Sequence, residues 1–432
     1  MSLQFITGGS GAGKSEYLSR LVCEESVRRP HDNFIVVVPE QYTMETQKKL
    51  VHMHSRKGIL NIDVVSFERL AYKVFEELGG GNRPVLDDTG KNLIVRRVLE
   101  KEKKKLDYFG SSIEKTGFVS ELKSVISELL QYGITPQQLG EIGENVKEKQ
   151  QLSAKLKDIR LVYEEFMAFL STNYITSEEI LDVLCGLVEK SKLIAGSEII
   201  FDGFTGFTPI QYKLMRLLLV YSKGIKISVT IDKKERPTGH ESWNNLFFMS
   251  KEMMNRLIAI CEEEGINVDD TVCVDRDINY RYEGAKDLAY LERNLFRYKG
   301  GVYTGTPENI RIYEGSNPKE ELQYIVSEIL QLTRKEGFRY RDIAVVTADL
   351  ETYGKVAANM MKQNDIPAFL DYKRSVASNP YVEMLCSALE IVEKGYPYDT
   401  MFRYLRTGLT GISRHDIDML ENYCLAVGIR GS

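Results

Sequence analysis

The stretch "ITGGSGAGKSEYL", Ile6–Leu18, decides the fold of the first part of this chain. It contains the pattern GxxxxGK[ST], in which a glycine-rich turn follows a strand and opens a helix. The backbone N–H groups of such a turn surround the phosphates of a nucleotide, and the lysine neutralises their charge. An apolar run precedes the pattern and a helical pattern follows it, Leu3–Thr7 and Ser15–Val27, which is the context that a phosphate loop requires.

We therefore predict a site for ATP and Mg²⁺ in this loop; the alternative is a glycine-rich turn with a chance lysine. The predicted nucleotide-binding residues are Gly8, Gly9, Ser10, Gly11, Ala12, Gly13, Lys14 and Ser15.

A motor needs more than a phosphate loop, namely an acidic residue on a second strand for Mg²⁺ and a neighbouring carboxylate that orients the attacking water. In "EIIFDG", Asp202 ends an apolar run where the magnesium ligand belongs, but Gly203 follows it in place of a glutamate. The next apolar run ends in Asp232, with no glutamine nearby to sense a terminal phosphate. We predict a weak Mg²⁺ site formed by Ser15 and Asp202, and no catalytic residue.

Short β-branched runs predict an α/β fold with a parallel sheet. The predicted strands are "LQFIT", "NFIVVVP", "NIDVVSF", "EIIFDG" and "IKISVTID". Between the third and the fourth, residues of about 87–192 are charged and have helical periodicity, so we read them as a helical insertion in a first domain of residues 1–235. The chain of 432 residues is too long for one core.

A helical connector is predicted for residues 236–305, and the start of a second, incomplete α/β domain for residues 306–432. The strands expected there are Ile310–Tyr313, "DIAVVTAD" and "IPAFLDY".

The composition excludes several classes of protein. The net charge of −5 argues against a protein that is basic throughout, although it permits a local groove for nucleic acid. The six cysteines are scattered singly, so neither a zinc site nor a disulfide framework is indicated. No apolar run approaches the roughly 20 residues that span a bilayer, and we expect a cytoplasmic protein with no membrane contact.

The order of these pieces resembles a superfamily 1 helicase core of the UvrD type. "VVVPEQYTMETQKKL" is placed like the first single-strand-binding motif, and "VVSFERLAYKVFEELGG" resembles the TFHSLA-type motif. "FDGFTGFTPIQ" occupies the place of DExQDxxxxQ without its acidic chemistry, and "GSNPKEELQYIVSEIL" resembles the start of the second motor domain. The resemblance implies that both predicted α/β domains are RecA-like. The glutamine with which the superfamily grips adenine lies upstream of its phosphate loop, and this chain starts too late to hold one.

One branch, the AddB family, has this degenerate set of motifs over essentially the whole chain. Its most specific pieces are "VPEQ.T", "SFERLAY", "FDGF..FTP", "AYLERNLF", "LRTGLT" and "LENYCLAVGIRG". This resemblance implies a motor-inactive part of the B subunit of a heterodimeric helicase–nuclease for double-strand DNA break repair by recombination. The partner would be the A subunit, which supplies the motor, and the ligands would be single- and double-stranded DNA in the nucleoid. The resemblance also implies recognition of the Chi hotspot on the 3′-ended strand, and a nuclease domain with an iron–sulfur cluster in a C-terminal region outside this chain.

Aromatic and polar side chains follow the predicted strands at the edge where open α/β sheets bind ligands. Stacking and bidentate hydrogen bonds hold and read a single strand, so these side chains are candidate DNA contacts. They are Gln41, Thr43, Phe67, Arg69, Tyr72, Phe204 and Phe207. Each aromatic residue could instead pack in the core. Two other functions stay open at this point, an active ATP-dependent DNA translocase and a phosphate-loop kinase of small molecules.

Overall fold

The computed structural model describes residues 1–431 apart from 80–83, 114, 116, 147–148, 177–178, 236–241, 298–299, 372–375 and 377. It divides into two compact units, Met1–Ile310 and Arg311–Ser432. The boundary that the sequence predicts at residues 235–236 adjoins 236–241, which lie outside the described residues.

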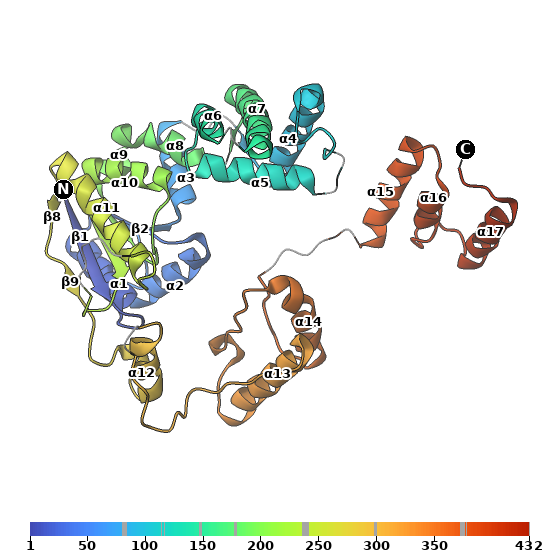
Figure 1. Cartoon of the computed structure of the whole chain (residues 1–432). Coiled ribbons are helices and arrows are strands. Elements are labelled where there is room, and N and C mark those ends of the chain that lie inside the picture. The colour runs from blue at the N-terminus through green and yellow to red at the C-terminus, as the bar shows by residue number, and fades with distance from the viewer. Residues whose placement is uncertain are drawn as a thin grey trace. The chain divides into compact units, whose positions relative to one another are not determined.

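A parallel sheet forms the centre of the first unit (Figure 1), and seven strands belong to it among the described residues. The order is β3-β2-β6-β7-β1-β8, with β9 also paired to β1. The strands are β1 Ser2–Gly8, β2 Asn33–Val37, β3 Ile62–Val65, β6 Ser197–Phe201, β7 Gly224–Thr230, β8 Asn267–Val268 and β9 Val272–Cys273. The five predicted strands and their parallel arrangement are confirmed.

Helices cover both faces of this sheet because both faces of each central strand are apolar. In β2, Ile35 and Val37 join one buried cluster, while Phe34 and Val36 join the other. The first cluster packs under α3, α8, α10 and α11, and the second under α1 and α2. The helices on the sheet are α1 Lys14–Arg28, α2 Thr43–Met53, α3 Phe67–Leu78, α8 Ile180–Cys185, α9 Lys192–Ala195, α10 Pro209–Tyr221 and α11 Phe248–Glu264, and α12 Lys286–Asn294 follows them in the chain.

The helical stretch between β3 and β6 has an apolar core of its own, which includes Val95, Leu99, Val162 and Phe166. Its helices are α4 Asp88–Glu102, α5 Phe118–Gln131, α6 Pro136–Asn145 and α7 Gln150–Asn173, and its short parallel strands are β4 Val85–Leu86 and β5 Ile175–Thr176. The buried carboxylate of Asp158 accepts the backbone N–H groups of residues 107–109 at 3.1, 2.8 and 2.9 Å, which fixes the turn that follows α4.

The second unit contains α13 Pro318–Lys335, α14 Leu350–Gln363, α15 Pro380–Glu393, α16 Tyr398–Leu405 and α17 Arg414–Val427. The strands predicted at 310–313, 342–349 and 366–372 are wrong for the part that the structure describes, where these segments are extended but unpaired. A strand is stabilised by its ladder, and these segments have no neighbouring ladder partner. Some of their apolar side chains face solvent, with Ile312 95% and Val346 91% exposed, whereas Ile366 packs in the core of this unit.

Candidate functional site

The phosphate loop joins β1 to α1 at the edge of the sheet where the parallel strands end. Strand β1 ends at Gly8 and α1 begins at Lys14. Gly11 and Gly13 have φ of +70° and +94°, a region in which only glycine is unstrained, so the turn depends on both. The loop residues predicted from the sequence are therefore brought together as one turn at the N-terminus of a helix, which attracts anions.

The ammonium group of Lys14 lies against this loop. Its Nζ donates to the carbonyl oxygens of Gly8 and Gly9, both at 2.9 Å. Burial lowers the pKa of Lys14, although the charges of Asp202 and Asp275 oppose the shift. The ammonium group therefore lies at the position in the loop from which a lysine neutralises phosphate charge.

Asp202 follows β6 and lies close enough to Lys14 to act on its charge. Its Oδ1 accepts the hydroxyl of Ser228, on the neighbouring strand β7, at 2.5 Å. Gly203 has a φ of +86°, a conformation that a glutamate would adopt only with strain. The backbone at this position is therefore unsuited to the water-orienting carboxylate that a motor requires.

A segment more than 260 residues away in sequence covers the loop, and the sequence analysis missed it. The buried side chain of Asn279 donates to the carbonyl oxygen of Ser10 at 3.2 Å. The backbone N–H of Arg281 donates to the carbonyl oxygen of Gly11 at 3.3 Å. Glu292, in α12, accepts the backbone N–H of Ser10 through Oε1 at 3.2 Å.

A cavity of about 610 Å³ lies beside the loop and the first turns of α1. It has an aromatic wall, because Tyr17 and Tyr280 both line it, and the guanidinium of Arg276 lies over the ring of Tyr280. Arg20 and Glu16 supply polar groups. A planar base fits such a lining, since aromatic and guanidinium faces stack on it. No sequence pattern indicated a base site, because its walls come from two distant segments.

The loops after β2, β3 and β6 open at the same edge of the sheet as the phosphate loop, because all these strands are parallel. Gln41, Arg69 and Tyr72 are exposed there. Thr43 is buried, and its hydroxyl donates to the carbonyl oxygen of Glu40 at 2.9 Å. Its side chain is therefore engaged with the turn that precedes α2.

Four phenylalanines form one aromatic cluster beneath these loops. Phe67 is 8% exposed, and its ring centroid lies 5.7, 5.3 and 6.0 Å from those of Phe201, Phe204 and Phe207. Phe204 and Phe207 are partly buried against the same core. In this state Phe67 packs in the core and presents no face for stacking.

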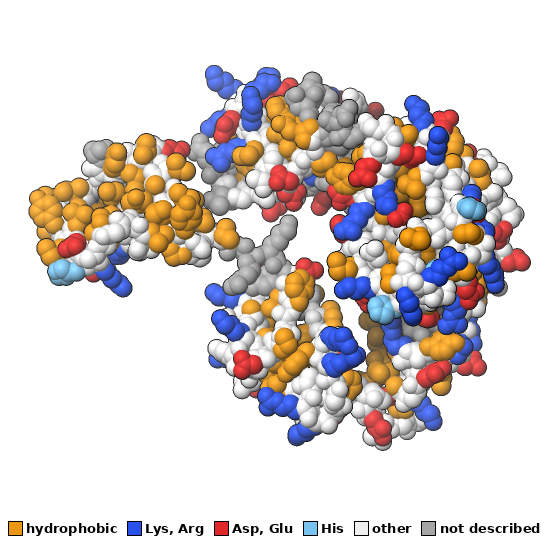
Figure 2. Space-filling view, turned by 180° about the vertical axis from the view of Figure 1, so that it is seen from behind, with side chains coloured by type: hydrophobic (Ala, Val, Ile, Leu, Met, Phe, Trp, Pro, Cys, Tyr) orange, Lys and Arg blue, Asp and Glu red, His pale blue; other side chains and the backbone are white. Residues whose placement is uncertain are grey.

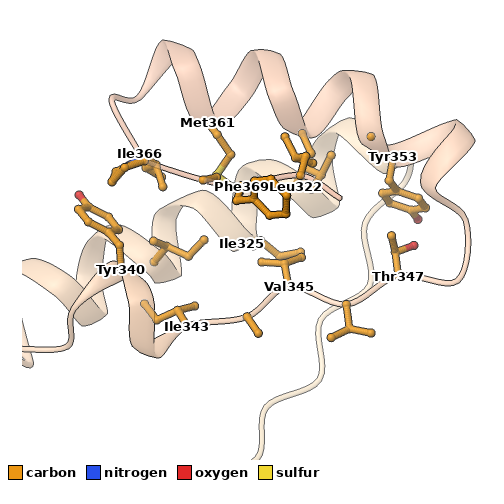
Figure 3. Close-up of a pocket in the computed structure, with 18 of the residues that line it drawn as sticks. Leu322, Ile325, Tyr340, Ile343, Val345, Thr347, Tyr353, Met361, Ile366 and Phe369 are labelled. Carbon is orange, nitrogen blue, oxygen red and sulfur yellow. The ribbon is translucent and has the colours of Figure 1, made fainter. Parts of the chain in front are cut away.

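A larger cavity, of about 810 Å³, lies within the second unit between α13, α14 and the extended segments after each helix (Figure 3). Ile325, Ile343, Met361 and Phe369 are among the apolar side chains that line it. Figure 2 shows hydrophobic side chains gathered on the part of the molecule that holds α15, α16 and α17. In α15, the exposed residues Tyr381, Leu385, Leu389 and Val392 share one face.

Among the described residues, no group of three or more histidine, cysteine, aspartate or glutamate side chains is arranged to hold a metal ion. None of the helices that the structure describes has the length and apolar character needed to cross a membrane.

The comparisons with known proteins agree on one family. A family model described as "ADDB, N-terminal" matches residues 5–292. Proteins named as the B subunit of an ATP-dependent helicase/deoxyribonuclease are similar over the whole chain, with 42% identity in Lachnoclostridium phytofermentans and 37% in both Caldanaerobacter subterraneus subsp. tengcongensis and Clostridioides difficile. The chain spans 38% of the first of these relatives and 37% of the other two. By its match to the family model and to these relatives, the chain belongs to the AddB family and corresponds to its N-terminal part.

Proposed function

We propose that this chain is the helicase-like, motor-inactive portion of the B subunit of a heterodimeric helicase–nuclease that processes double-strand DNA breaks for recombination. It binds a nucleotide without significant hydrolysis. The proposal rests on two features of the site taken together. Lys14 donates hydrogen bonds to an intact phosphate loop, as nucleotide binding requires. The position after Asp202, where a motor has its water-orienting carboxylate, is Gly203 with a left-handed backbone.

The nucleotide site takes ATP or ADP with Mg²⁺. Its phosphates lie in the loop Gly8–Ser15, and its base lies in the cavity beside Tyr17 and Tyr280. The hydroxyl of Ser15 and the carboxylate of Asp202 are oxygen ligands of the kind that Mg²⁺ prefers, and they would hold the metal weakly. The parallel sheet, with its phosphate loop after the first strand, supports a RecA-like domain.

The DNA site lies at the same edge of the sheet. Gln41 and Arg69 are exposed donors that suit base edges, and Tyr72 is an exposed ring that suits stacking. We propose that these side chains hold the 3′-ended single strand and take part in recognition of the Chi hotspot. Thr43, Phe67, Phe204 and Phe207 support the loops from beneath.

The partners in this proposal are the A subunit, which supplies the motor, and DNA in single- and double-stranded form, in the cytoplasm at the nucleoid. The nuclease activity and the iron–sulfur cluster belong to the C-terminal region of the whole protein, which lies outside this chain.

One observation favours the alternative, an active ATP-dependent translocase. The side chain of Arg281 acts on the charge of Lys14, and an arginine beside a phosphate loop stabilises the transition state of phosphoryl transfer.

Steady-state ATP hydrolysis with and without single-stranded DNA separates the two functions. The chain should bind Mg-nucleotide and single-stranded DNA with no turnover above that of the Lys14→Ala variant. Turnover that DNA stimulates, and that Lys14→Ala removes, would replace the proposal with the translocase.

A further inference from the structure

Glu292 holds the phosphate loop at Ser10, a residue that does not line the cavity beside α1. Its Oε1 accepts the N–H of Ser10, and the same oxygen lies 3.1 Å from the position that a Cβ on Gly9 would take. In a phosphate loop, this N–H would otherwise face a phosphate oxygen. A carboxylate therefore occupies a place where the loop offers a donor to an anion.

The direction in which a nucleotide lies in this loop follows from the position of the cavity. The cavity is lined by Ala12, Gly13 and the first turns of α1 on one side and by residues 273–276 and Tyr280 on the other, and a Cβ on Gly13 would lie 3.4 Å from the ring of Tyr280. A nucleoside held there starts its phosphate chain at the α1 side of the loop. The chain then passes Gly13 and Lys14 and points towards Ser10, so the last phosphate of a triphosphate meets Glu292.

Carboxylates lie at that end of the loop beside two basic groups, Lys14 and Arg293, whose charges interact with that of Glu292. The side chain of Asp275 lies beside Gly9, and its buried Oδ1 has no hydrogen-bond donor among the described residues. Burial raises the pKa of Glu292, and the charge of Asp275 adds to that rise, although the N–H of Ser10 opposes it. Two carboxylates already crowd this place, and a terminal phosphate would bring a further negative charge into it.

We propose that Glu292 makes the site selective for nucleoside diphosphates over nucleoside triphosphates. This inference rests on the proposed nucleotide site and adds the residue that sets its preference. A diphosphate fills the part of the loop at Gly13 and the N-terminus of α1 and leaves the contact between Glu292 and Ser10 in place. A triphosphate has to break that contact and place its last phosphate beside Glu292 and Asp275.

Calorimetric titration of the full chain with Mg-ADP, with Mg-ATP and with the β,γ-imido analogue of Mg-ATP tests this inference. We expect Mg-ADP to bind about tenfold more tightly than either triphosphate, a modest part of what like charges a few ångströms apart produce near a protein surface. Glu292→Gln keeps the shape of the side chain and a hydrogen-bond acceptor but removes the negative charge. It should therefore improve triphosphate binding and reduce the ratio of the Mg-ADP affinity to the Mg-ATP affinity to below about threefold. Glu292→Ala should shift the ratio in the same direction.

The matched control is Glu24→Gln, which removes one negative charge from an exposed position of α1, ten residues beyond Lys14. It should leave the ratio unchanged. Equal binding of the two nucleotides by the unmutated chain, or a preference that Glu292→Gln leaves intact, overturns the inference while the nucleotide site stands. Absence of binding by every nucleotide to every variant overturns the nucleotide site as well.

Discussion

The hydroxyl of Ser228 donates to Oδ1 of Asp202, so the carboxylate that follows β6 is oriented by the neighbouring strand β7. One oxygen of the carboxylate is occupied by this bond. For the other oxygen, the residues that the structure describes supply no hydrogen-bond donor, and the carboxylate lies at the edge of the sheet where Lys14 and the phosphate loop lie. A ligand of Mg²⁺ is most effective when its position is fixed before the metal arrives.

Asp202→Asn should remove most of the benefit that Mg²⁺ brings to nucleotide binding. The variant loses a charged oxygen ligand of the metal. It also loses a negative charge near the phosphates, so the nucleotide should bind equally well or more tightly when Mg²⁺ is absent. Titrations with and without Mg²⁺ give the ratio of the two affinities. Asp63→Asn, on β3, is the control and should keep the ratio of the unmutated chain. A D202N variant that responds to Mg²⁺ as the unmutated chain does would exclude Asp202 as the ligand.

Lys14→Ala should abolish measurable binding of Mg-ADP and Mg-ATP. Hydrogen bonds to charged groups contribute about 1.5–3 kcal/mol each, and a weak site does not tolerate such a loss. Lys48→Ala, which removes an exposed lysine of α2, should bind as the unmutated chain does. Equal heats of binding for Lys14→Ala and Lys48→Ala would show that the loop does not hold phosphate.

Tyr280→Ala should weaken nucleotide binding about tenfold or less, because stacking on one ring contributes about 0.5–1.5 kcal/mol. Tyr280→Phe keeps the ring and should restore most of the affinity. Competition between ADP and inorganic pyrophosphate provides the measurement, since pyrophosphate has no base and should bind both variants alike. A loss of pyrophosphate binding in Tyr280→Ala would place the ring at the phosphates and not at the base.

Arg69→Ala and Gln41→Ala should reduce the response to the Chi hotspot in the complete two-subunit enzyme. A bidentate contact to a base contributes about 1–3 kcal/mol of discrimination, whereas binding to random single strands depends mainly on phosphates. The position at which cleavage stops is the readout for recognition. The control is Arg28→Ala, at the end of α1 near the opposite edge of the sheet, where the strands begin.

A normal hotspot response in both variants would place the reading site in other loops. An equal loss of binding to every sequence would assign Arg69 and Gln41 to the DNA backbone.

Asp158→Ala should destabilise the helical core of α4–α7 by about 2–4 kcal/mol, because three backbone N–H groups lose their acceptor. Its effect should appear as a lower midpoint in urea unfolding followed by circular dichroism. Asp107→Ala is the control, since Asp107 contributes through its side chain an exposed ion pair with Lys157, at 2.9 Å, and such pairs contribute about 0–1 kcal/mol. Similar midpoints for the two variants would contradict the role of Asp158.

The sequence predicted the centre of the first unit because its strands are apolar runs bounded by turn residues. It missed β8 and β9, whose two residues each are too short to produce a pattern. The segment from Asn279 to Glu292 was missed for another reason. Its contacts with Ser10 and Gly11 join residues far apart in the chain, and neither spacing nor composition reports such a contact.

The sequence was least informative where one residue type serves two purposes. An aromatic residue after a strand fits DNA stacking and core packing equally well, and the contacts of Phe67 with Phe201 and Phe204 became visible only in three dimensions. In the second unit, apolar β-branched runs predicted strands. A strand also needs a neighbour, and Val346 and Ile312 have none in the described residues.

The position of β1 inside the sheet has a consequence for biosynthesis. Strand β1 leaves the ribosome well before its partners β7, β8 and β9, which lie between Gly224 and Cys273. At about 5–20 residues per second, translation from the end of β1 at Gly8 to the partner strands takes on the order of 10–50 s. During that time the helical core of α4–α7, whose contacts are local, can fold on the nascent chain, while β1 remains unpaired. The phosphate loop is therefore among the last parts of the unit to form, and the chaperones that meet the growing chain meet its first strand exposed.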